Sequence, residues 1–426
     1  MKSKSVRLIP LFDTHSAFVK TSEAEYEESR PYITEYISGF QDQLDARGDF
    51  DAVRQFLKSN SKVETTFNNY RTQVERLLLW AWNKRGKSIL AFRRVDMEEF
   101  MDFCCKPDAA WISTSISSRF ILDGGVFAPN PEWRPFNMRV GKATMKLANE
   151  RNASAPKPSF QIAASSIRQV YAVLNSLFNF CAHEQLMGIN PCLHIGKNKD
   201  KWTSRDMIEV SSKSLTHLQW DFVLETAELM AKESPTKGVR TLFCIAMMRG
   251  CYARISDLVG NGKWRPTMGS FKQTELGWWY HVVGKGNVQD KIGVMPDCIE
   301  HLKRYRQMLG LPDYPYPGEN EPLLRTAHGR AGLTGRQVRK DVQEVFDRTI
   351  ARMQAEGFSE SESGALRSAT LHWFRHTGAT FDAPHRNPKN LQADMRHKSL
   401  ATTQDIYYNT IDNERAAETS RLKLQR

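Results

Sequence analysis

The sequence predicts a mostly α protein with a small antiparallel β-sheet (α+β), organised in two domains. Three observations support this fold class. Apolar residues recur at helical spacing over much of the chain, an aromatic and β-branched segment at 277–283 is typical of a strand, and a polar, charged stretch at 196–213 resembles a linker. A chain of 426 residues is long enough for two or three domains with sizeable cores.

The composition favours an intracellular protein with a polyanionic partner. The formal net charge is +12 and the pI is about 9.3, which points toward nucleic acid. The seven cysteines are odd in number and form no C-x-x-C pair, so neither a disulfide framework nor a zinc site is expected. The N-terminal apolar run is cut by Pro10 and Asp13, unlike a signal peptide, and runs such as 242–248 are too short to cross a membrane.

The N-terminal part is expected to be a helical domain preceded by an extension. Residues 1–50 show only a weak helical pattern and form an N-terminal extension of unknown role. From residue 65 the apolar positions repeat at i, i+3 and i+4, which predicts an amphipathic helix, and a shorter helix is expected over 97–105. Residues 107–160 are rich in Pro, Gly and Asn and are interpreted as an insertion of loops with room for one helix.

A second amphipathic helix is expected to begin at Ser165 or Ser166 and to end around Gly188. The two long helices would form a domain over 51–200, with basic residues on their outer faces. Such faces suit DNA binding, whereas the plain alternative is a helical bundle with a solvated basic face. The candidate DNA-binding residues are Arg71, Arg76 and Arg168.

The C-terminal part, over 201–426, is expected to form a second domain of helices around a β-hairpin. The strand at 277–283 is followed by the turn G-K-G-N and by a second strand from Lys291, which places Lys285 at the tip of the hairpin. Helices are predicted over 215–232, 237–248, 297–309 and 336–355, with another beginning at Arg254.

The segment 368–409 carries the side chains with the clearest chemistry. Ser368 is expected to cap a helix that places His372 and Arg375 on one face, three residues apart. Imidazole, guanidinium and phenol groups suit a phosphate-centred reaction with a phenolic nucleophile, because Arg grips phosphate in a planar fork and His moves protons near neutral pH. The later candidates in the segment are His397, Tyr407 and Tyr408.

Two other interpretations of the same helix stay open. His372 and His376 stand at i and i+4, like a zinc pair, but the metalloprotease motif needs Glu where this chain has Trp373. Both histidines could also be partly buried structural residues. We expect no metal ligand among them.

The order of these candidates resembles the tyrosine recombinase (phage integrase) family over most of residues 60–410. The phrases that carry the resemblance are A-R-I-S-D-L, G-K-G-N, L-H-W-F-R-H-T-G-A-T and H-K-S-L-A-T-T-Q-D-I-Y. The resemblance implies a core-binding domain followed by a catalytic domain. It also implies a site-specific DNA recombinase that acts as a homo-tetramer on double-stranded DNA in the cytoplasm, associated with the nucleoid. The family needs neither cofactor nor metal, and an accessory directionality factor can take part.

The resemblance assigns the nucleophile to Tyr407, with Tyr408 as second choice. A phenol has a pKa of about 10, so about a thousandth is ionised at pH 7 and a base must take its proton. His372 is the candidate base. The product would be a 3′-phosphotyrosine and a free 5′ hydroxyl.

The remaining roles concern the charge on the phosphate and the leaving group. Arg254 and Arg375 are expected to neutralise the phosphate, and His397 to donate a hydrogen bond to it. Lys285 is the candidate acid for the departing 5′ oxygen. Asp257, one turn after Arg254, is expected to orient the cations of the site.

Three departures from the family pattern stand out. Arg396 occupies the position before the second His, where the family usually has Gly. The connector contains Pro384 and Pro388, so His385 is a minor rival for a site role. One extra residue precedes the tyrosines, which keeps Tyr408 in consideration.

Two rival functions are a type IB topoisomerase and a non-catalytic DNA-binding protein on a recombinase scaffold. The short core-binding helices and the residues after the tyrosines favour the recombinase, and all the catalytic residue types are present. The tail at 410–426 contains good helix formers but too little apolar surface to hold a helix strongly on its own protomer. The resemblance to the family implies that such a tail binds a neighbouring subunit.

Overall fold

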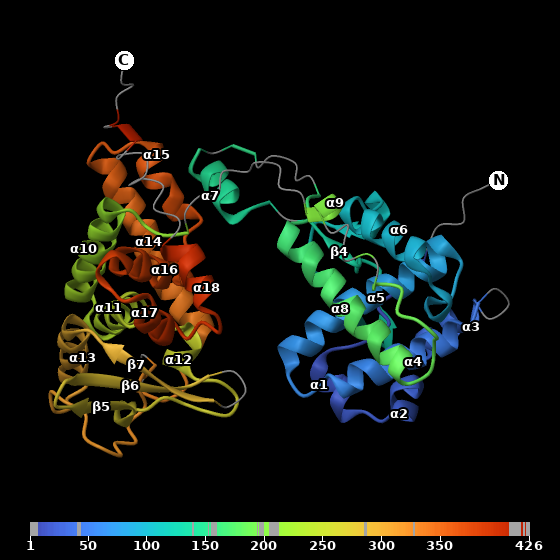
Figure 1. The fold of residues 1–426 in the computed structure, drawn as a ribbon, viewed down its shortest axis with the longest axis horizontal. Helices are drawn as coiled ribbons and strands as arrows, with labels where there is room; N and C mark the ends of the chain where they lie inside the picture. Colours follow the sequence, from blue (N-terminus) through green and yellow to red (C-terminus); the bar gives the residue numbers. More distant parts are fainter. Residues whose placement is uncertain are drawn as a thin grey trace. The chain divides into compact units, whose positions relative to one another are not determined.

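The protein divides into two compact units, Met1–Glu209 and Val210–Arg426 (Figure 1). The computed structural model describes residues 7–40, 44–138, 140–151, 153–154, 160–193, 195, 200–203, 213–284, 288–326, 329–408, 419–420 and 422. The expected linker spans the division between the units, and most of it lies outside the described residues. The predicted fold class, mostly α with a small antiparallel sheet, is confirmed.

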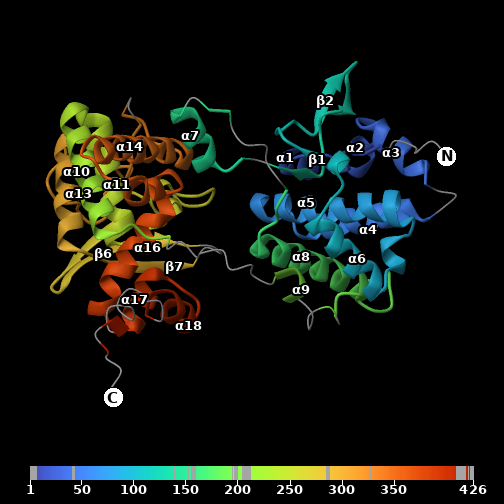
Figure 2. The same cartoon turned by 90° about the horizontal axis from the view of Figure 1, so that it is seen from above.

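The first unit is a helical bundle with short strands inserted. Its elements are α1 (His15–Lys20), α2 (Glu23–Glu28), α3 (Pro31–Ser38), α4 (Ala46–Ser59), α5 (Glu64–Trp80), η1 (Ala81–Arg85), η2 (Ile89–Ala91), α6 (Arg94–Cys105), η3 (Ala109–Trp111), β1 (Ile112–Ser113), β2 (Phe120–Asp123), β3 (Val126–Pro129), β4 (Phe136–Asn137), α7 (Lys142–Glu150), α8 (Ala164–His183) and α9 (Asp200–Thr203). The two predicted long helices are α5 and α8, which pack side by side (Figure 2). Burial of one apolar stripe on each helix explains their stability in this unit.

The N-terminal segment contributes to the core of the first unit. The ring of Phe12 stacks on Phe50 of α4 with centroids 5.0 Å apart, and Tyr26 donates a hydrogen bond to the Leu11 carbonyl. Residue 50, where the expected extension ends, lies inside α4, so the segment is continuous with the bundle. Helices of six to eight residues are too short to show a clear period, which explains the weak pattern in the sequence.

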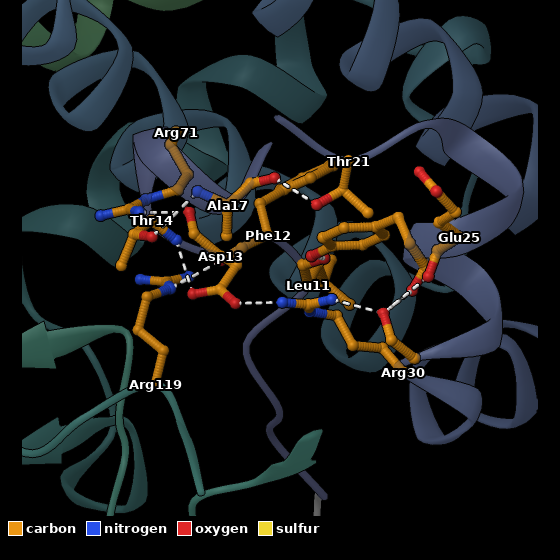
Figure 3. Close-up of polar contacts among 12 residues, drawn as sticks. Leu11, Phe12, Asp13, Thr14, Ala17, Thr21, Glu25, Arg30, Arg71 and Arg119 are labelled. Atoms are coloured by element: carbon orange, nitrogen blue, oxygen red, sulfur yellow. Dashed lines mark hydrogen bonds and ion pairs between the residues drawn. The ribbon is translucent and has the colours of Figure 1, made fainter. Parts of the chain in front are cut away.

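Buried charges also fasten this segment (Figure 3). Arg30 forms an ion pair with Asp13, and Arg71 of α5 donates to the Asp13 carbonyl. Glu75 of α5 accepts from the Leu11 amide at 2.7 Å and pairs with Arg119. Because each charge has a partner, the segment can be buried without an isolated ion.

The expected insertion contains strands that the sequence analysis missed. β1 pairs with β4 in parallel, and β2 pairs with β3 as an antiparallel hairpin. The hairpin turns at Gly124 and Gly125, with φ of +56° and +88°, a conformation that glycine adopts without penalty. Strands of two to four residues give no usable period, although the Gly-Gly pair was a turn signal.

The second unit is built around a buried helix. Its elements are α10 (His217–Glu233), α11 (Pro235–Gly250), α12 (Ile255–Val259), η5 (Met268–Ser270), β5 (Phe271–Thr274), β6 (Gly277–Val283), β7 (Gln289–Val294), α13 (Pro296–Met308), α14 (Gly335–Ala355), α15 (Glu360–Ser363), η6 (Gly364–Arg367), α16 (Leu371–Asp382), η7 (Ala383–His385), α17 (Pro388–Met395), α18 (Leu400–Thr403) and η8 (Gln404–Tyr408). The helices predicted in this unit are confirmed, with ends within a few residues. α11 packs against α10, α13, α14 and α16 (Figure 1).

One glycine sets the distance between α16 and the end of α11. A Cβ on Gly378 would lie 2.0 Å from the Arg249 carbonyl oxygen, so any other residue there would force the two backbones apart. α16 begins after Thr370, and the expected N-cap Ser368 lies outside the helix, in the turn that follows η6. This close packing holds α16 against the segment that leads from α11 to α12.

The sheet has the order β5–β6–β7 and is antiparallel throughout. The predicted hairpin is confirmed as β6 and β7, in which Val283 pairs with Gln289. β5, which was not predicted from the sequence, is a short strand with one buried residue, Phe271. Lys285, expected at the hairpin tip, lies outside the described residues. Among the residues described, no helix is both long and apolar enough to span a bilayer.

Candidate active site

Segments far apart in the sequence meet around the carbonyl oxygen of Met395, the last residue of α17. Arg375 of α16 donates to this oxygen through Nη2. Arg254, the N-cap residue of α12, donates to the same oxygen at 3.2 Å. The two arginines predicted to bind phosphate therefore converge on one point of the backbone.

Arg375 is buried, with 2% of its surface exposed, and also donates to the Tyr252 carbonyl. Burial, with the nearby charges of Arg254 and Arg396, lowers its pKa to about 9. The pKa of Arg254 is lowered by the same causes, burial first and then Arg396. A bound anion would reduce the repulsion between these neighbouring cations.

Asp257 is the buried carboxylate of this cluster. It accepts a hydrogen bond from the Arg254 backbone amide at 2.7 Å, which caps α12, and it pairs with Arg396. Tyr280 of β6 donates to the backbone carbonyl of Asp257. The start of α12 is thus tied to both the sheet and the turn after α17.

Tyr407 lies in η8 with 3% of its surface exposed. Its hydroxyl is 2.7 Å from Nδ1 of His376, and its ring is parallel to that of His397, with centroids 6.2 Å apart. Burial raises the pKa of Tyr407 to about 12. Burial, reinforced by His372, lowers the pKa of His376 to about 4, so its neutral ring can accept the phenol proton in a hydrogen bond.

Tyr408 is directed elsewhere. Its hydroxyl donates to the Arg386 carbonyl at 2.8 Å, on the connector between α16 and α17. Burial raises its pKa, and Arg386 opposes the rise. Of the two tyrosines, Tyr407 is the one placed among the histidines and beside Arg375, whose charge acts on its pKa.

Two of the other predicted residues are histidines that lie close to His376 and Tyr407. His372 is exposed on α16, with its ring 4.8 Å from that of His376. His397 follows the turn after α17, its Nδ1 lies 3.0 Å from Oγ1 of Thr403, and burial lowers its pKa to about 4. Lys291 lies on β7 with its ammonium over the ring of Trp279.

Sequence reasoning missed the contacts of two residues. His376 was considered only as a zinc ligand or a structural residue, yet it holds the hydroxyl of Tyr407. Its spacing of four residues from His372 was the available signal, since both face one side of the helix. Arg396 was seen only as a departure from the family pattern, and its ion pair with Asp257 could not be inferred from the sequence.

The arginines proposed for DNA binding differ in their surroundings. Arg71 is engaged with the Asp13 carbonyl, and Arg76 donates to the Pro135 carbonyl at 2.9 Å (Figure 3 shows Arg71). Burial lowers the pKa of Arg71 to about 10 and lowers that of Arg76. Arg168 on α8 is exposed. Two of the three thus make contacts inside their own unit.

A helical unit is thus followed along the chain by a second unit of helices with a three-stranded antiparallel sheet, and this arrangement can be compared with solved structures. One similar solved structure is the XerH site-specific recombinase in a post-cleavage complex with palindromic difH substrate. The match covers 96% of this chain and 93% of the XerH chain, with a TM-score of 0.54 and 14% sequence identity. That similarity concerns the fold.

Curated relatives match part of the sequence. Tyrosine recombinase XerC of Rickettsia rickettsii (strain Sheila Smith) is 29% identical over 141 residues, which is 33% of this chain and 40% of XerC. XerC of Neisseria meningitidis serogroup B (strain ATCC BAA-335 / MC58) is 30% identical over 129 residues, which is 30% of this chain and 36% of XerC. The match therefore spans about 40% of the length of these relatives. No family model matches the chain. The predicted resemblance to the tyrosine recombinase family is confirmed.

Proposed function

We propose that this protein is a site-specific DNA recombinase that cuts and rejoins double-stranded DNA through a covalent bond to Tyr407. The observation that carries the proposal is the position of the Tyr407 hydroxyl, hydrogen-bonded to His376, in a unit where Arg254 and Arg375 converge. The second unit is the catalytic domain in this proposal, and the first unit is the core-binding domain.

The chemistry proposed is an exchange of one phosphodiester for another. The Tyr407 oxygen attacks the phosphorus and gives its proton to a neighbouring base, while the bond from phosphorus to the 5′ oxygen breaks. The 3′-phosphotyrosine then keeps the energy of the broken linkage, and attack by a 5′ hydroxyl reverses the step. Because one phosphodiester bond replaces another, the proposed reaction needs no ATP, metal or other cofactor.

His372 remains the proposed base, because it lies on the exposed side of α16, where DNA can reach it. His376 is the residue that holds the hydroxyl of Tyr407 in this structure. Partial burial, together with the charges of Arg375 and Arg254, lowers the pKa of His372, so its ring is neutral and able to accept a proton at pH 7. Lys285 is the proposed acid for the 5′ oxygen.

The arginines provide the electrostatic part of the mechanism. The attacked phosphate gains negative charge, and preorganised cations stabilise that charge best when they are held away from water. Arg375 is buried and both arginines are aimed by backbone carbonyls, so they lose little freedom when the phosphate binds. Asp257 is proposed to orient Arg254 through its backbone amide.

Binding is proposed to involve double-stranded DNA, to which a net charge of +12 contributes favourably. The solved XerH neighbour is bound to its difH substrate, which supports DNA as the partner class. Arg168, exposed on α8, is the proposed phosphate contact of the three candidate arginines. We further propose a homo-tetramer on two duplexes, joined by the tail at 410–426, and an accessory directionality factor. Most of the tail lies outside the described residues.

A covalent capture experiment tests the proposal. The protein is incubated with a library of nicked duplexes with a randomised core, denatured, and separated from free DNA. We expect DNA that remains attached to the protein, released by protease, and we expect no attachment with Tyr407→Phe. Non-covalent binding with no attached DNA would indicate a DNA-binding protein without cleavage activity. Joining of two captured sites would separate a recombinase from a type IB topoisomerase.

A further inference from the structure

Arg396, directly after α17, has an unusual backbone conformation. Its φ is +50° and its ψ is 46°, the left-handed region that non-glycine residues seldom adopt. Glycine is the residue that this position favours, because it has no Cβ to clash with the carbonyl. An arginine held there suggests that its side chain contributes something that glycine cannot.

The side chain of Arg396 is buried, with 7% of its surface exposed. One end of the guanidinium pairs with Asp257, and its Nε is buried without a hydrogen-bond partner in the part of the chain that the structure describes. Nη1 lies 4.0 Å from the point that a Cβ of Gly284 would occupy, at the end of β6. The side chain therefore reaches from the turn after α17 to the start of α12 and to the hairpin end of β6.

The same turn aims the two other arginines of the site. The carbonyl oxygen of Met395 accepts from Arg254 and from Arg375, and the carbonyl oxygen of Arg396 accepts from Arg254 at 3.4 Å. Asp257, the partner of Arg396, accepts from the amide of Arg254. A movement of this turn would thus displace both guanidinium groups.

We propose that Arg396 is a positioning residue of the active site. Its ion pair with Asp257 fixes the turn at 395–397 against the start of α12, and so aims Arg254 and Arg375 at a single phosphate. The inference rests on the proposed function, in that the phosphate belongs to DNA. The anion site itself can be tested without DNA.

The first test uses inorganic orthovanadate, a tetrahedral anion, as the probe. We expect Arg396→Gly to keep its fold, since glycine suits the left-handed backbone, but to bind vanadate about ten-fold more weakly because Arg254 and Arg375 are no longer aimed together. Isothermal titration of the full-length protein measures the affinity. Unchanged vanadate affinity in a folded Arg396→Gly protein would overturn the proposal, whether or not the protein cuts DNA.

The second test measures single-turnover formation of the covalent adduct on captured DNA. Arg396→Gly is expected to lower the rate about 100-fold while the Kd for DNA changes little, because a displaced catalytic group costs rate more than binding. Loss of DNA affinity with an unchanged rate would contradict a positioning role.

Two controls separate positioning from general loss of stability. Arg240 forms a comparably buried pair with Asp341, so Arg240→Lys is the matched control for Arg396→Lys. We expect only Arg396→Lys to lower the adduct rate, since an ammonium lacks the planar fork. In an Asp257→Asn background, Arg396→Gly should lose most of its effect. An undiminished effect there would mean that Arg396 acts on the phosphate directly, and the proposal would be wrong.

Discussion

The hydroxyl of Tyr407 lies 2.7 Å from Nδ1 of His376, one helical turn along α16 from His372. The phenol is buried and its pKa is raised to about 12, chiefly by that burial. In this arrangement the tyrosine is held protonated beside a neutral ring. In the proposed reaction the phenol gives up this proton to a base as its oxygen attacks the phosphate.

The first prediction concerns the choice of tyrosine. Tyr407→Phe should bind DNA with normal affinity and form no covalent adduct, because the attacking oxygen is gone. Tyr408→Phe is the matched control, and it should keep substantial activity, since the hydroxyl of Tyr408 contacts only the Arg386 carbonyl among the described hydrogen bonds. Denaturing gels of labelled DNA measure both. The reverse result would place the nucleophile one position further along.

The second prediction concerns pH and stability. His376 and His397 each have a pKa lowered to about 4, first by burial. The unfolded chain therefore binds more protons than the folded one as pH falls from about 6.5 toward 4, so the free energy of unfolding should fall over that window and be flat above it. Urea unfolding at pH 7 and pH 5 measures the change. In His376→Gln the loss between these two values should be smaller, and an identical loss would show that His376 does not contribute.

The third prediction concerns the general acid. Lys285→Ala should cripple cleavage of ordinary DNA, and activity should recover on a substrate with sulfur at the 5′ bridging position, since a thiolate leaves without a proton. Burst kinetics on both substrates measure the recovery. If the sulfur substrate is cut no faster by the variant, Lys291 becomes the next candidate. EDTA should have no effect on either substrate.

The fourth prediction separates DNA contacts from internal ones. Arg168→Ala should weaken DNA binding and reduce the slope of log affinity against log salt by about 1, the amount expected for one phosphate contact. Arg71→Ala should instead lower the midpoint of thermal unfolding, because it breaks the contact with the Asp13 carbonyl. Fluorescence anisotropy across a salt series gives the slopes. Equal slopes for wild type and Arg168→Ala would exclude the contact.

The fifth prediction concerns the tail. Removal of the residues after Asp412 should spare binding to a single DNA site but weaken synapsis and recombination, since the tail is proposed to bind a neighbouring subunit. Gel shifts with one and two sites distinguish these steps. Normal assembly and recombination by the truncated protein would show that the tail is only a solvated end.

Much of the fold could be predicted because its signals are local. The apolar stripes of α5, α8 and α14 repeat over four turns or more, so the helical period is clear in the sequence. The hairpin of β6 and β7 was marked by its Gly-containing turn. The strands of the 107–160 region and β5 were missed, since two to four residues are too few to define a period.

The candidate site divides in a similar way. Motif order alone selected Arg254, Arg375, His397 and the pair of tyrosines, because each lies in a short phrase with its own residue pattern. The tertiary structure determined that Tyr407, and not Tyr408, lies against His376. The two tyrosines are neighbours in η8, so their order in the sequence does not indicate which of them lies against His376.

The sequence thus determined which chemical groups this protein has and in what order, because helical periods, turns and motifs are properties of neighbouring residues. Only the tertiary structure decided what those groups touch. Arg71 appeared to be a surface cation and proved to hold the Asp13 carbonyl, and Arg396 pairs with Asp257 across a long stretch of chain. Such contacts form where segments distant in the sequence pack together. A charged side chain can be buried there only because packing brings a partner for it within hydrogen-bond reach.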